Sequence, residues 1–266
     1  MEIEVSGPRI WFEIPLVEDF GFPQLHLDFA ITDTAISSFV VMIFLCALFV
    51  ILGRKPTKRP GKIQVLVEKL VSMLYGMVEE TMGAHNMKFA PYIGALFLSS
   101  IFGSLISTTG VFRSSTADLS TTATWAIMTT LIVWGSNIKE NGFLGWLKGF
   151  TEPVVFITPM NVISEIASPI SMAFRHFGNV VGGSVLTGLI YSALAMVSGI
   201  VFSWIPNAFI ASIPFLQVGI PAVLSLYFDF FAGGIQALVF CMLSMVYIGA
   251  ANPPHPEKEE LSSSPN

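Results

Sequence analysis

The sequence predicts an all-α polytopic membrane protein: about five membrane helices, the last two long and strongly tilted, plus a cytoplasmic amphipathic helix. Hydrophobic residues make up 53% of the 266 residues and charged residues only 12%. A soluble domain carries about 25% charged residues, so this chain is built to lie mostly in lipid. The apolar residues also gather into tracts long enough to cross a bilayer. We expect one membrane domain over residues 1–266.

The N-terminal segment, residues 1–30, is acidic and aromatic, with no basic region followed by an apolar core as in a signal peptide. The first apolar tract, residues 35–52, has the length of a membrane crossing. It is followed by a basic cluster made of Arg54, Lys55, Lys58, Arg59 and Lys62. The positive-inside rule places such a cluster in the cytoplasm, so we expect an extracytoplasmic N-terminal segment.

Residues 62–82 carry apolar side chains at helical spacing on one side and charged or amide side chains on the other. This pattern predicts an amphipathic helix that lies on the cytoplasmic surface or against its neighbours.

Two further crossings are predicted over residues 89–107 and over residues 123–134 with their flanks. Between them Asp118 stands at the start of a helix rich in Ser and Thr. The local sequence favours a helix N-cap for this carboxylate. After the second of these crossings we expect a cytoplasmic connection with a short helix around residues 143–150.

Two long hydrophobic tracts follow, over residues 161–204 and 206–250. A helix over residues 170–201 would be about 48 Å long, against a hydrocarbon core of about 30 Å. It must therefore tilt strongly or break near Gly182-Gly183 or Gly188. The last helix should run from about Pro221 to Ala250, and residues 253–266 read as a disordered cytoplasmic tail.

Arg175 is the only Lys or Arg between Lys148 and Lys258. An Arg at the centre of a spanning helix costs about 2.5–3.5 kcal/mol on insertion scales, so it normally faces protein or water. Steps of three and four residues place it on one stripe of small and polar residues, which we call the polar stripe: Ser164, Ser168, Ser171, Arg175, Gly178, Asn179 and Gly182. Such a stripe on an apolar helix is expected to face a protein partner.

On the last predicted helix Asp229 and Gln236 are seven residues apart and so share a face. They suit Arg175 as partners. Two interpretations stay open at this point: a structural Arg175–Asp229 ion pair, or a pathway for ions.

Other chemistry finds little support in the sequence. The acidic N-terminal segment and tail argue against nucleic acid as a partner. The two cysteines, Cys46 and Cys241, lie in apolar runs and are expected to be buried thiols, and the four histidines form no metal motif. We find no nucleotide-binding loop and no nucleophile with its base, so we expect no catalytic site and no cofactor.

Three segments carry a resemblance to a known family. The run SPISMAFRHFGNVVGG around Arg175, the run TADLSTTATWA around Asp118 and the end GGIQALVFCMLSMVYIGAA with Gln236 occur in this order. Together they resemble subunit a of the F-type ATP synthase, and the resemblance covers the chain after about residue 30.

The resemblance implies a bacterial membrane stator subunit, with the ring of c subunits, the peripheral-stalk b subunits and the lipid bilayer as partners. Two offset half-channels would lead protons or sodium ions to the ring carboxylates, with Arg175 between them. Asn179 and Gln236 would hold the Arg175 head. Asp118 and Asp229 would be relay carboxylates of the outer half-channel, and Glu165 would belong to the inner one.

The sequence departs from the family at three positions. Ser184 stands where many members carry an acidic residue or His, and Ser120 replaces a more usual Asn beside Asp118. The residue after the Arg is His176, where Leu is common. We expect its side chain to point away from the ring, although an imidazole with an ordinary pKa near 6.5 could join a relay.

Two rival functions remain. A secondary transporter or channel could bind an anionic substrate at Arg175, but it predicts an internal repeat and a second broken helix, and we find neither in the sequence. A membrane scaffold in which Arg175 and Asp229 simply pair would need no transport at all.

Overall fold

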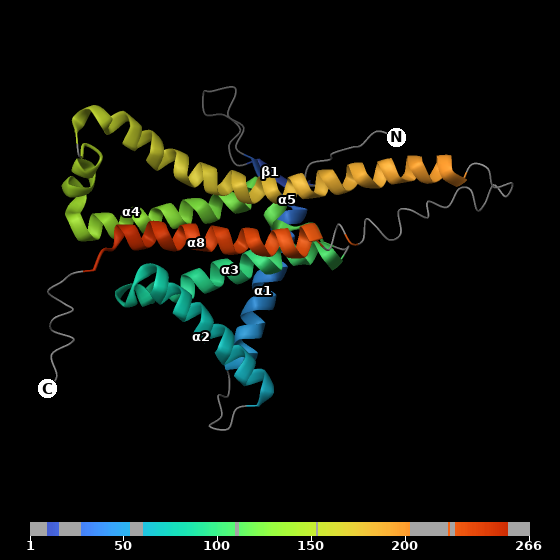
Figure 1. The fold of residues 1–266 in the computed structure, drawn as a ribbon, viewed down its shortest axis with the longest axis horizontal. Helices are drawn as coiled ribbons and strands as arrows, with labels where there is room; N and C mark the ends of the chain where they lie inside the picture. Colours follow the sequence, from blue (N-terminus) through green and yellow to red (C-terminus); the bar gives the residue numbers. More distant parts are fainter. Residues whose placement is uncertain are drawn as a thin grey trace. The chain divides into compact units, whose positions relative to one another are not determined.

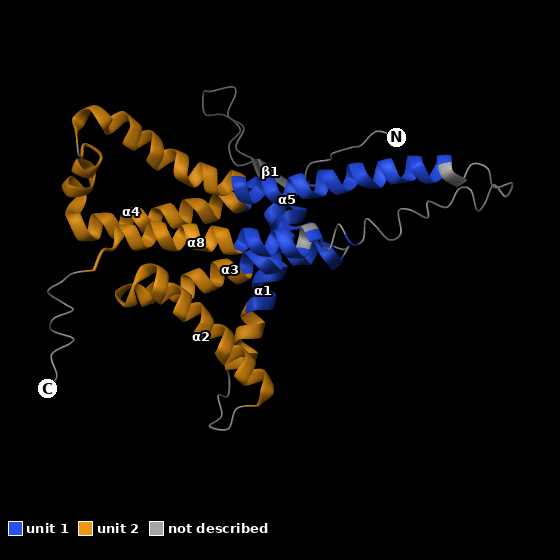
Figure 2. Cartoon of the chain, in the orientation of Figure 1, with its two compact units in different colours: residues 1–45, 99–121, 175–237 blue, residues 46–98, 122–174, 238–266 orange. Residues whose placement is uncertain are grey.

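The computed structural model describes residues 10–15, 28–53, 61–109, 112–152, 154–202, 223 and 227–254, and most of them are helical (Figure 1). The chain forms two compact units, each built from three separated stretches (Figure 2). Unit 1 contains Met1–Leu45, Ser99–Thr121 and Arg175–Ala237, and unit 2 contains Cys46–Leu98, Thr122–Phe174 and Leu238–Asn266. Several helices therefore contribute one part to each unit. The single membrane domain over residues 1–266 stays a prediction.

Unit 1 begins with a hairpin that the sequence analysis missed. Strands β1 (Ile10–Pro15) and β2 (Asp28–Thr32) pair antiparallel, with Glu13 opposite Ala30 and an irregular register between Ile10 and Phe12. The run IWFEIP is rich in the β-branched and aromatic residues that strands favour. Apart from this hairpin, the described elements of unit 1 are helical, as predicted.

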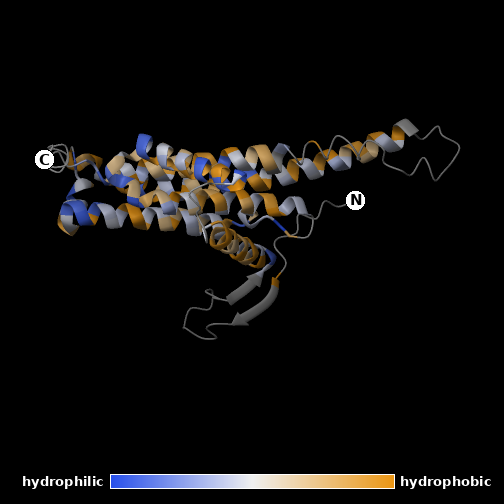
Figure 3. Ribbon diagram, turned by 90° about the horizontal axis from the view of Figure 1, so that it is seen from below, coloured by the Kyte–Doolittle hydropathy of each residue, from blue (hydrophilic) through white to orange (hydrophobic). Residues whose placement is uncertain are grey.

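Four helical segments of the described chain are long and apolar enough to cross a membrane: Asp33–Gly53, Ala84–Thr109, Val155–Ile200 and Phe230–Ala251. Helix α1 (Asp33–Gly53) shows how they are built, because its small polar residues Thr34 and Ser37 are buried while Phe39 is 63% exposed. Figure 3 shows hydrophobic residues along the length of the helices. Apolar side chains on the outside suit a chain surrounded by lipid.

In unit 2, helix α2 (Lys62–Met82) has the predicted bounds, and only Val78 and Met82 of its residues are buried. The turn after it contains Gly83 with φ +81° and leads through the 3₁₀ helix η1 (Ala84–Phe89) into α3 (Ala90–Leu105) and η2 (Ile106–Thr109). Only glycine adopts this φ without strain, so Gly83 fixes where α2 ends.

Helix α4 (Leu119–Gly149) follows the 3₁₀ helix η3 (Ser115–Ala117). It kinks at Gly142, where φ is +71°, so the predicted short helix over residues 143–150 is its last part. The predicted crossing over residues 123–134 lies within α4. However, α4 is not one of the four helical segments of the described chain that are long and apolar enough to cross a membrane.

Helix α5 (Thr158–Phe202) follows the 3₁₀ helix η4 (Val155–Ile157) and runs unbroken for 45 residues, about 68 Å at 1.5 Å per residue. Of the two predicted alternatives, a strong tilt or a break near Gly182-Gly183 or Gly188, the break does not occur. A single glycine costs a helix only about 1 kcal/mol, which the long apolar flanks outweigh. A strong tilt remains the way to fit its length to a bilayer.

The last predicted helix, residues 221–250, is only partly confirmed. A π-helical segment, η5 (Tyr227–Ala232), precedes α8 (Gly233–Ala251). Most of residues 203–226, the basic cluster except Lys62, and the tail beyond residue 254 lie outside the described residues. Cys241 is buried as expected, but Cys46 is exposed, because its side chain lies on the apolar outer side of α1.

Candidate functional site

Arg175 lies on an exposed strip of α5 in unit 1, together with Gly178, Asn179 and Gly182. Among the described residues, a Cβ added at Gly178 or Gly182 would meet nothing within 4 Å. Glycine inside a helix costs about 1 kcal/mol relative to alanine, and packing within the described chain does not require it here. The two glycines therefore leave room for something outside the described chain.

Within the described part of the chain, neither a hydrogen bond nor a salt bridge engages the Arg175 guanidinium. Gln236, its predicted amide partner, does not contact it by a hydrogen bond there. Asp229 lies within η5, but the structure does not describe its side chain. The predicted Arg175–Asp229 ion pair therefore stays a prediction. A permanently charged guanidinium on an apolar helix can bind an anionic group such as a carboxylate.

Two other predicted residues of unit 1 lie on α5 and α8. The Asn179 amide Nδ2 donates to the Ala232 carbonyl oxygen at 3.3 Å and so connects α5 to η5. Gln236 is only 8% exposed, and its Nε2 has no hydrogen-bond partner among the described residues. A buried N–H without an acceptor costs about 1–3 kcal/mol. The Gln236 Nε2 group is therefore available to donate a hydrogen bond to an acceptor outside the described residues.

His176 and Ser184 differ in their surroundings, although both are on α5. The His176 side chain is 0% exposed, and its Nε2 lies 3.2 Å from Ser100 Oγ of α3, also in unit 1. The imidazole therefore faces the interior of unit 1 while Arg175 is exposed, and the orientation of His176 away from the ring stays a prediction. Ser184 is exposed, and its hydroxyl donates to Val181 O of its own helix at 2.8 Å.

Asp118 caps the N-terminus of α4, as predicted, because its Oδ1 accepts from Ser120 N at 3.0 Å and from Ser120 Oγ at 2.9 Å. Its Oδ2 accepts from Thr34 Oγ1 of α1 at 2.6 Å. Partial burial raises the pKa of Asp118, but the hydrogen bonds from Thr34 and Ser120, with the charge of Arg113, outweigh it and leave the pKa below its ordinary value. The carboxylate is therefore held ionised at neutral pH.

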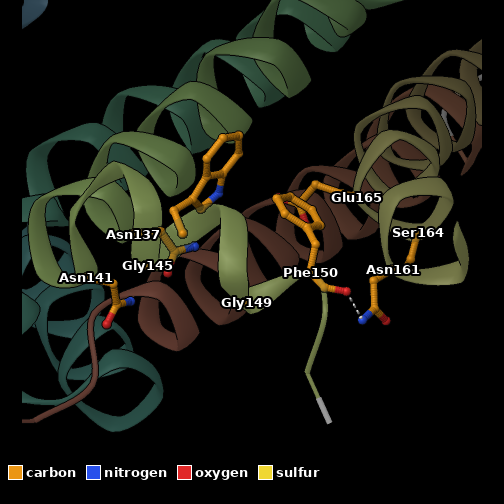
Figure 4. A pocket seen from close by; sticks show the side chains of 9 residues that line it. Asn137, Asn141, Gly145, Gly149, Phe150, Asn161, Ser164 and Glu165 are labelled. Carbon is orange, nitrogen blue, oxygen red and sulfur yellow. Dashed lines mark hydrogen bonds between the residues drawn. The ribbon is translucent and has the colours of Figure 1, made fainter. Parts of the chain in front are cut away.

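Unit 2 contains the remaining candidate, Glu165, which lies on α5 ten residues before Arg175. Its Oε1 accepts a hydrogen bond from Trp134 Nε1 of α4 at 2.5 Å. It lines a cavity of about 400 Å³ between the end of α4 and the start of α5 (Figure 4). Figure 4 shows Asn137 and Asn141 on one side of this cavity and Ser164 on the other. The cavity thus offers one carboxylate among three side-chain amides (Asn137, Asn141 and Asn161) and one hydroxyl (Ser164).

A second cavity of unit 2, about 290 Å³ in volume, shares Asn137, Ser164 and Glu165 with the first. It extends along α4 and α8 to Thr129 and Tyr247. Glu165 therefore lies in the wall common to both cavities.

Sequence reasoning missed several residues that the structure brings into these sites: Thr34, Ser100, Trp134 and Asn137. Spacing along one helix says nothing of partners on other helices. A usable signal existed only for Asn137 and Asn141, which lie one helical turn apart and so share a face of α4.

The chain is similar to characterised proteins along most of its length. The sequence model of the family described as ATP synthase A chain matches residues 35–249. The sodium ion specific ATP synthase subunit a of Propionigenium modestum is 33% identical over an alignment of 266 residues, which covers 92% of this chain and 84% of the relative. ATP synthase subunit a of Moorella thermoacetica is 30% identical and covers 82% of this chain and 89% of the relative. The protein of the same name from Aquifex aeolicus is 31% identical, with coverages of 80% and 93%.

Proposed function

Since this chain belongs to the ATP synthase A chain family, and so is a membrane subunit of the F-type ATP synthase, we propose that it couples ion flow to rotation of the c-ring through Arg175. The observation that supports this most strongly is the exposed Arg175, which has no partner among the described residues. A passing ring carboxylate would be favoured in its ionised form beside the guanidinium. Each carboxylate would then release its ion to one half-channel and reload from the other.

Arg suits this position because its guanidinium does not release its proton at physiological pH, so it blocks ions without carrying them. Each elementary charge that leaked past it would lose about 2.3 kcal/mol per 100 mV of membrane potential. Asn179 and Gln236 would hold the Arg175 head through their side-chain amide oxygens, because a guanidinium only donates hydrogen bonds.

The inner half-channel in this proposal contains Glu165 and the two cavities that share it. Asn137 and Ser164 would keep water in the path, and the Glu165 carboxylate would attract the cation. Trp134 holds one carboxylate oxygen, so the other remains to exchange ions.

The outer half-channel would begin near Asp118 and include Asp229. Because hydrogen bonds keep Asp118 ionised, it would act as a fixed negative charge that concentrates cations at the entrance. This assignment places the N-terminus outside and the C-terminus in the cytoplasm of a bacterial cell membrane. The peripheral-stalk b subunits and lipid would cover other apolar surfaces, such as that of α1.

The coupling ion is a proton or a sodium ion. The relative from Propionigenium modestum is sodium ion specific by name, which makes sodium worth testing directly. A transporter that binds an anionic substrate is the less favoured alternative, since the family accounts for Arg175 without such a substrate.

The test is ATP-driven ion uptake by inverted membrane vesicles, with and without sodium, for wild-type and Arg175→Ala complexes. We expect Arg175→Ala to abolish pumping while the complex still assembles, and the sodium dependence to identify the ion. Lys69→Ala, which removes an exposed cation of α2, is the matched control and should pump normally. Undiminished pumping by Arg175→Ala would refute the proposal.

A further inference from the structure

We propose that His176 is a positioning residue for Arg175: its buried hydrogen bond to Ser100 fixes the rotation of α5, so that Arg175 remains on the exposed side. This inference rests on the proposed function of Arg175. It assigns His176 a mechanical role in place of ion transfer.

The first argument is that few side chains in this part of α5 are buried. Among the described side chains of α5 from Arg175 to Ile200, the buried residues are His176, Gly183 and Ser198. None of these is an apolar side chain. From Arg175 to Ile200 the single large buried side chain is therefore the imidazole, and the nearest buried apolar side chains of α5, Met172 and Ala173, precede Arg175.

The second argument is geometry. Neighbouring residues of an α-helix point about 100° apart, so the direction of His176 determines that of Arg175. The His176 Nε2 to Ser100 Oγ distance of 3.2 Å ties α5 to α3, and both residues are 0% exposed. One turn after Arg175, the Asn179 bond to Ala232 O ties α5 to η5. Two directional bonds to two different elements, both from residues that follow Arg175, thus restrain the rotation of this part of α5.

The third argument is the cost of the arrangement. An imidazole buried in a membrane helix costs more than a leucine would, since its polar atoms need partners. A hydrogen bond has a direction, which leucine packing lacks. The buried imidazole is therefore better explained by orientation than by stability.

A relay of protons through His176 makes the opposite prediction, and glutamine separates the two. Its side-chain amide reaches the position of the imidazole Nε2, and it can bond Ser100 but cannot titrate. Under the positioning role, His176→Gln keeps pumping and its pH profile. Under a relay role, His176→Gln loses both.

The experiment measures ions pumped per ATP hydrolysed in inverted vesicles with equal amounts of assembled complex. We expect His176→Ala and Ser100→Ala to lower this ratio about fivefold, as loss of one hydrogen bond allows, and His176→Gln to restore it. Ser198→Ala removes another buried hydroxyl of α5 and serves as the matched control, with an unchanged ratio expected.

Ser100→Ala removes a single oxygen atom, so it gives an answer even if His176→Ala does not assemble. An unchanged ratio in Ser100→Ala, or a His176→Gln variant as impaired as His176→Ala, would overturn the inference. Arg175→Ala, run in parallel, separates the two proposals. If Arg175→Ala pumps normally, the proposed function is refuted. If Arg175→Ala is inactive while Ser100→Ala and His176→Ala pump normally, only the positioning role of His176 is refuted.

Discussion

The Thr34 hydroxyl donates a 2.6 Å hydrogen bond to the Asp118 carboxylate, across 84 positions of the sequence. Thr34 is 1% exposed, and its Oγ1 also lies 2.8 Å from Thr32 Oγ1. Because the Thr34 hydrogen is used by Asp118, Thr32 must be the donor of the second bond. A chain of hydroxyls thus leads from the hairpin to the carboxylate that caps α4.

Thr34→Val should destabilise the complex by about 1.5–3 kcal/mol at neutral pH, since the lost bond joins a hydroxyl to a charged group. The pKa of Asp118 is lowered in the folded protein. Its stabilising effect is therefore present above the ordinary Asp pKa of about 4 and disappears as pH falls through the folded value. The thermal midpoints of wild type and variant should accordingly converge at acidic pH. Thr34→Ser keeps the hydroxyl and should match wild type, and a gap that persists below the folded pKa would contradict this origin.

Glu165→Gln should strongly reduce ion pumping while the amount of assembled complex stays the same, because the amide cannot exchange a cation as the carboxylate does. Trp134→Phe removes only the N–H that holds Oε1, so it should have a smaller effect. Initial rates of ATP-driven uptake measure both. If Glu165→Gln pumped at the wild-type rate, Glu165 would be a structural residue and the two cavities would not conduct.

Gly178→Leu should leave the fold of the subunit intact, because among the described residues nothing lies within 4 Å of an added Cβ. It should nevertheless impair pumping, since a large side chain would occupy the space proposed for the ring. Gly76→Leu on α2, where the described neighbourhood is equally open, provides the comparison. Equal activity of the two variants would place the ring elsewhere.

Asn86 joins the end of α8 to the turn after α2, both in unit 2. Its Nδ2 donates to Met82 O at 2.9 Å and to Asn252 O at 3.1 Å, and the residue is 1% exposed. Asn86→Ala should cost about 1–3 kcal/mol, because buried carbonyl groups lose their donor. His85→Ala removes a more exposed partner of Asn252 O and should cost less. Thermal unfolding in detergent measures both variants. A larger loss of stability in His85→Ala than in Asn86→Ala would be inconsistent with this network.

Local patterns predicted part of this structure well. The amphipathic periodicity gave α2 its bounds, and the Ser-rich start of α4 identified Asp118 as a cap. Of the two alternatives predicted for α5, a strong tilt or a break at its glycines, the break does not occur, because a glycine weakens a helix only slightly. The hairpin was missed although the run IWFEIP has a composition that strands favour, and the π-helical segment η5 was missed because it has no strong local signal.

Tertiary partners could not be predicted from spacing. The bonds from Thr34 to Asp118 and from Ser100 to His176 join helices that are distant in sequence, and hydroxyls are common throughout the chain. The outward direction of Arg175 was predictable, because the small residues of the polar stripe lie on its side of α5.

The central claim is that the positive charge of Arg175 couples ion flow to rotation. The most direct test is the number of ions pumped per ATP hydrolysed by Arg175→Ala and Arg175→Gln complexes, compared with wild type at equal assembly. We predict that this ratio falls to background in both variants, because neither side chain can keep a passing carboxylate ionised. A wild-type ratio in either variant would contradict the account.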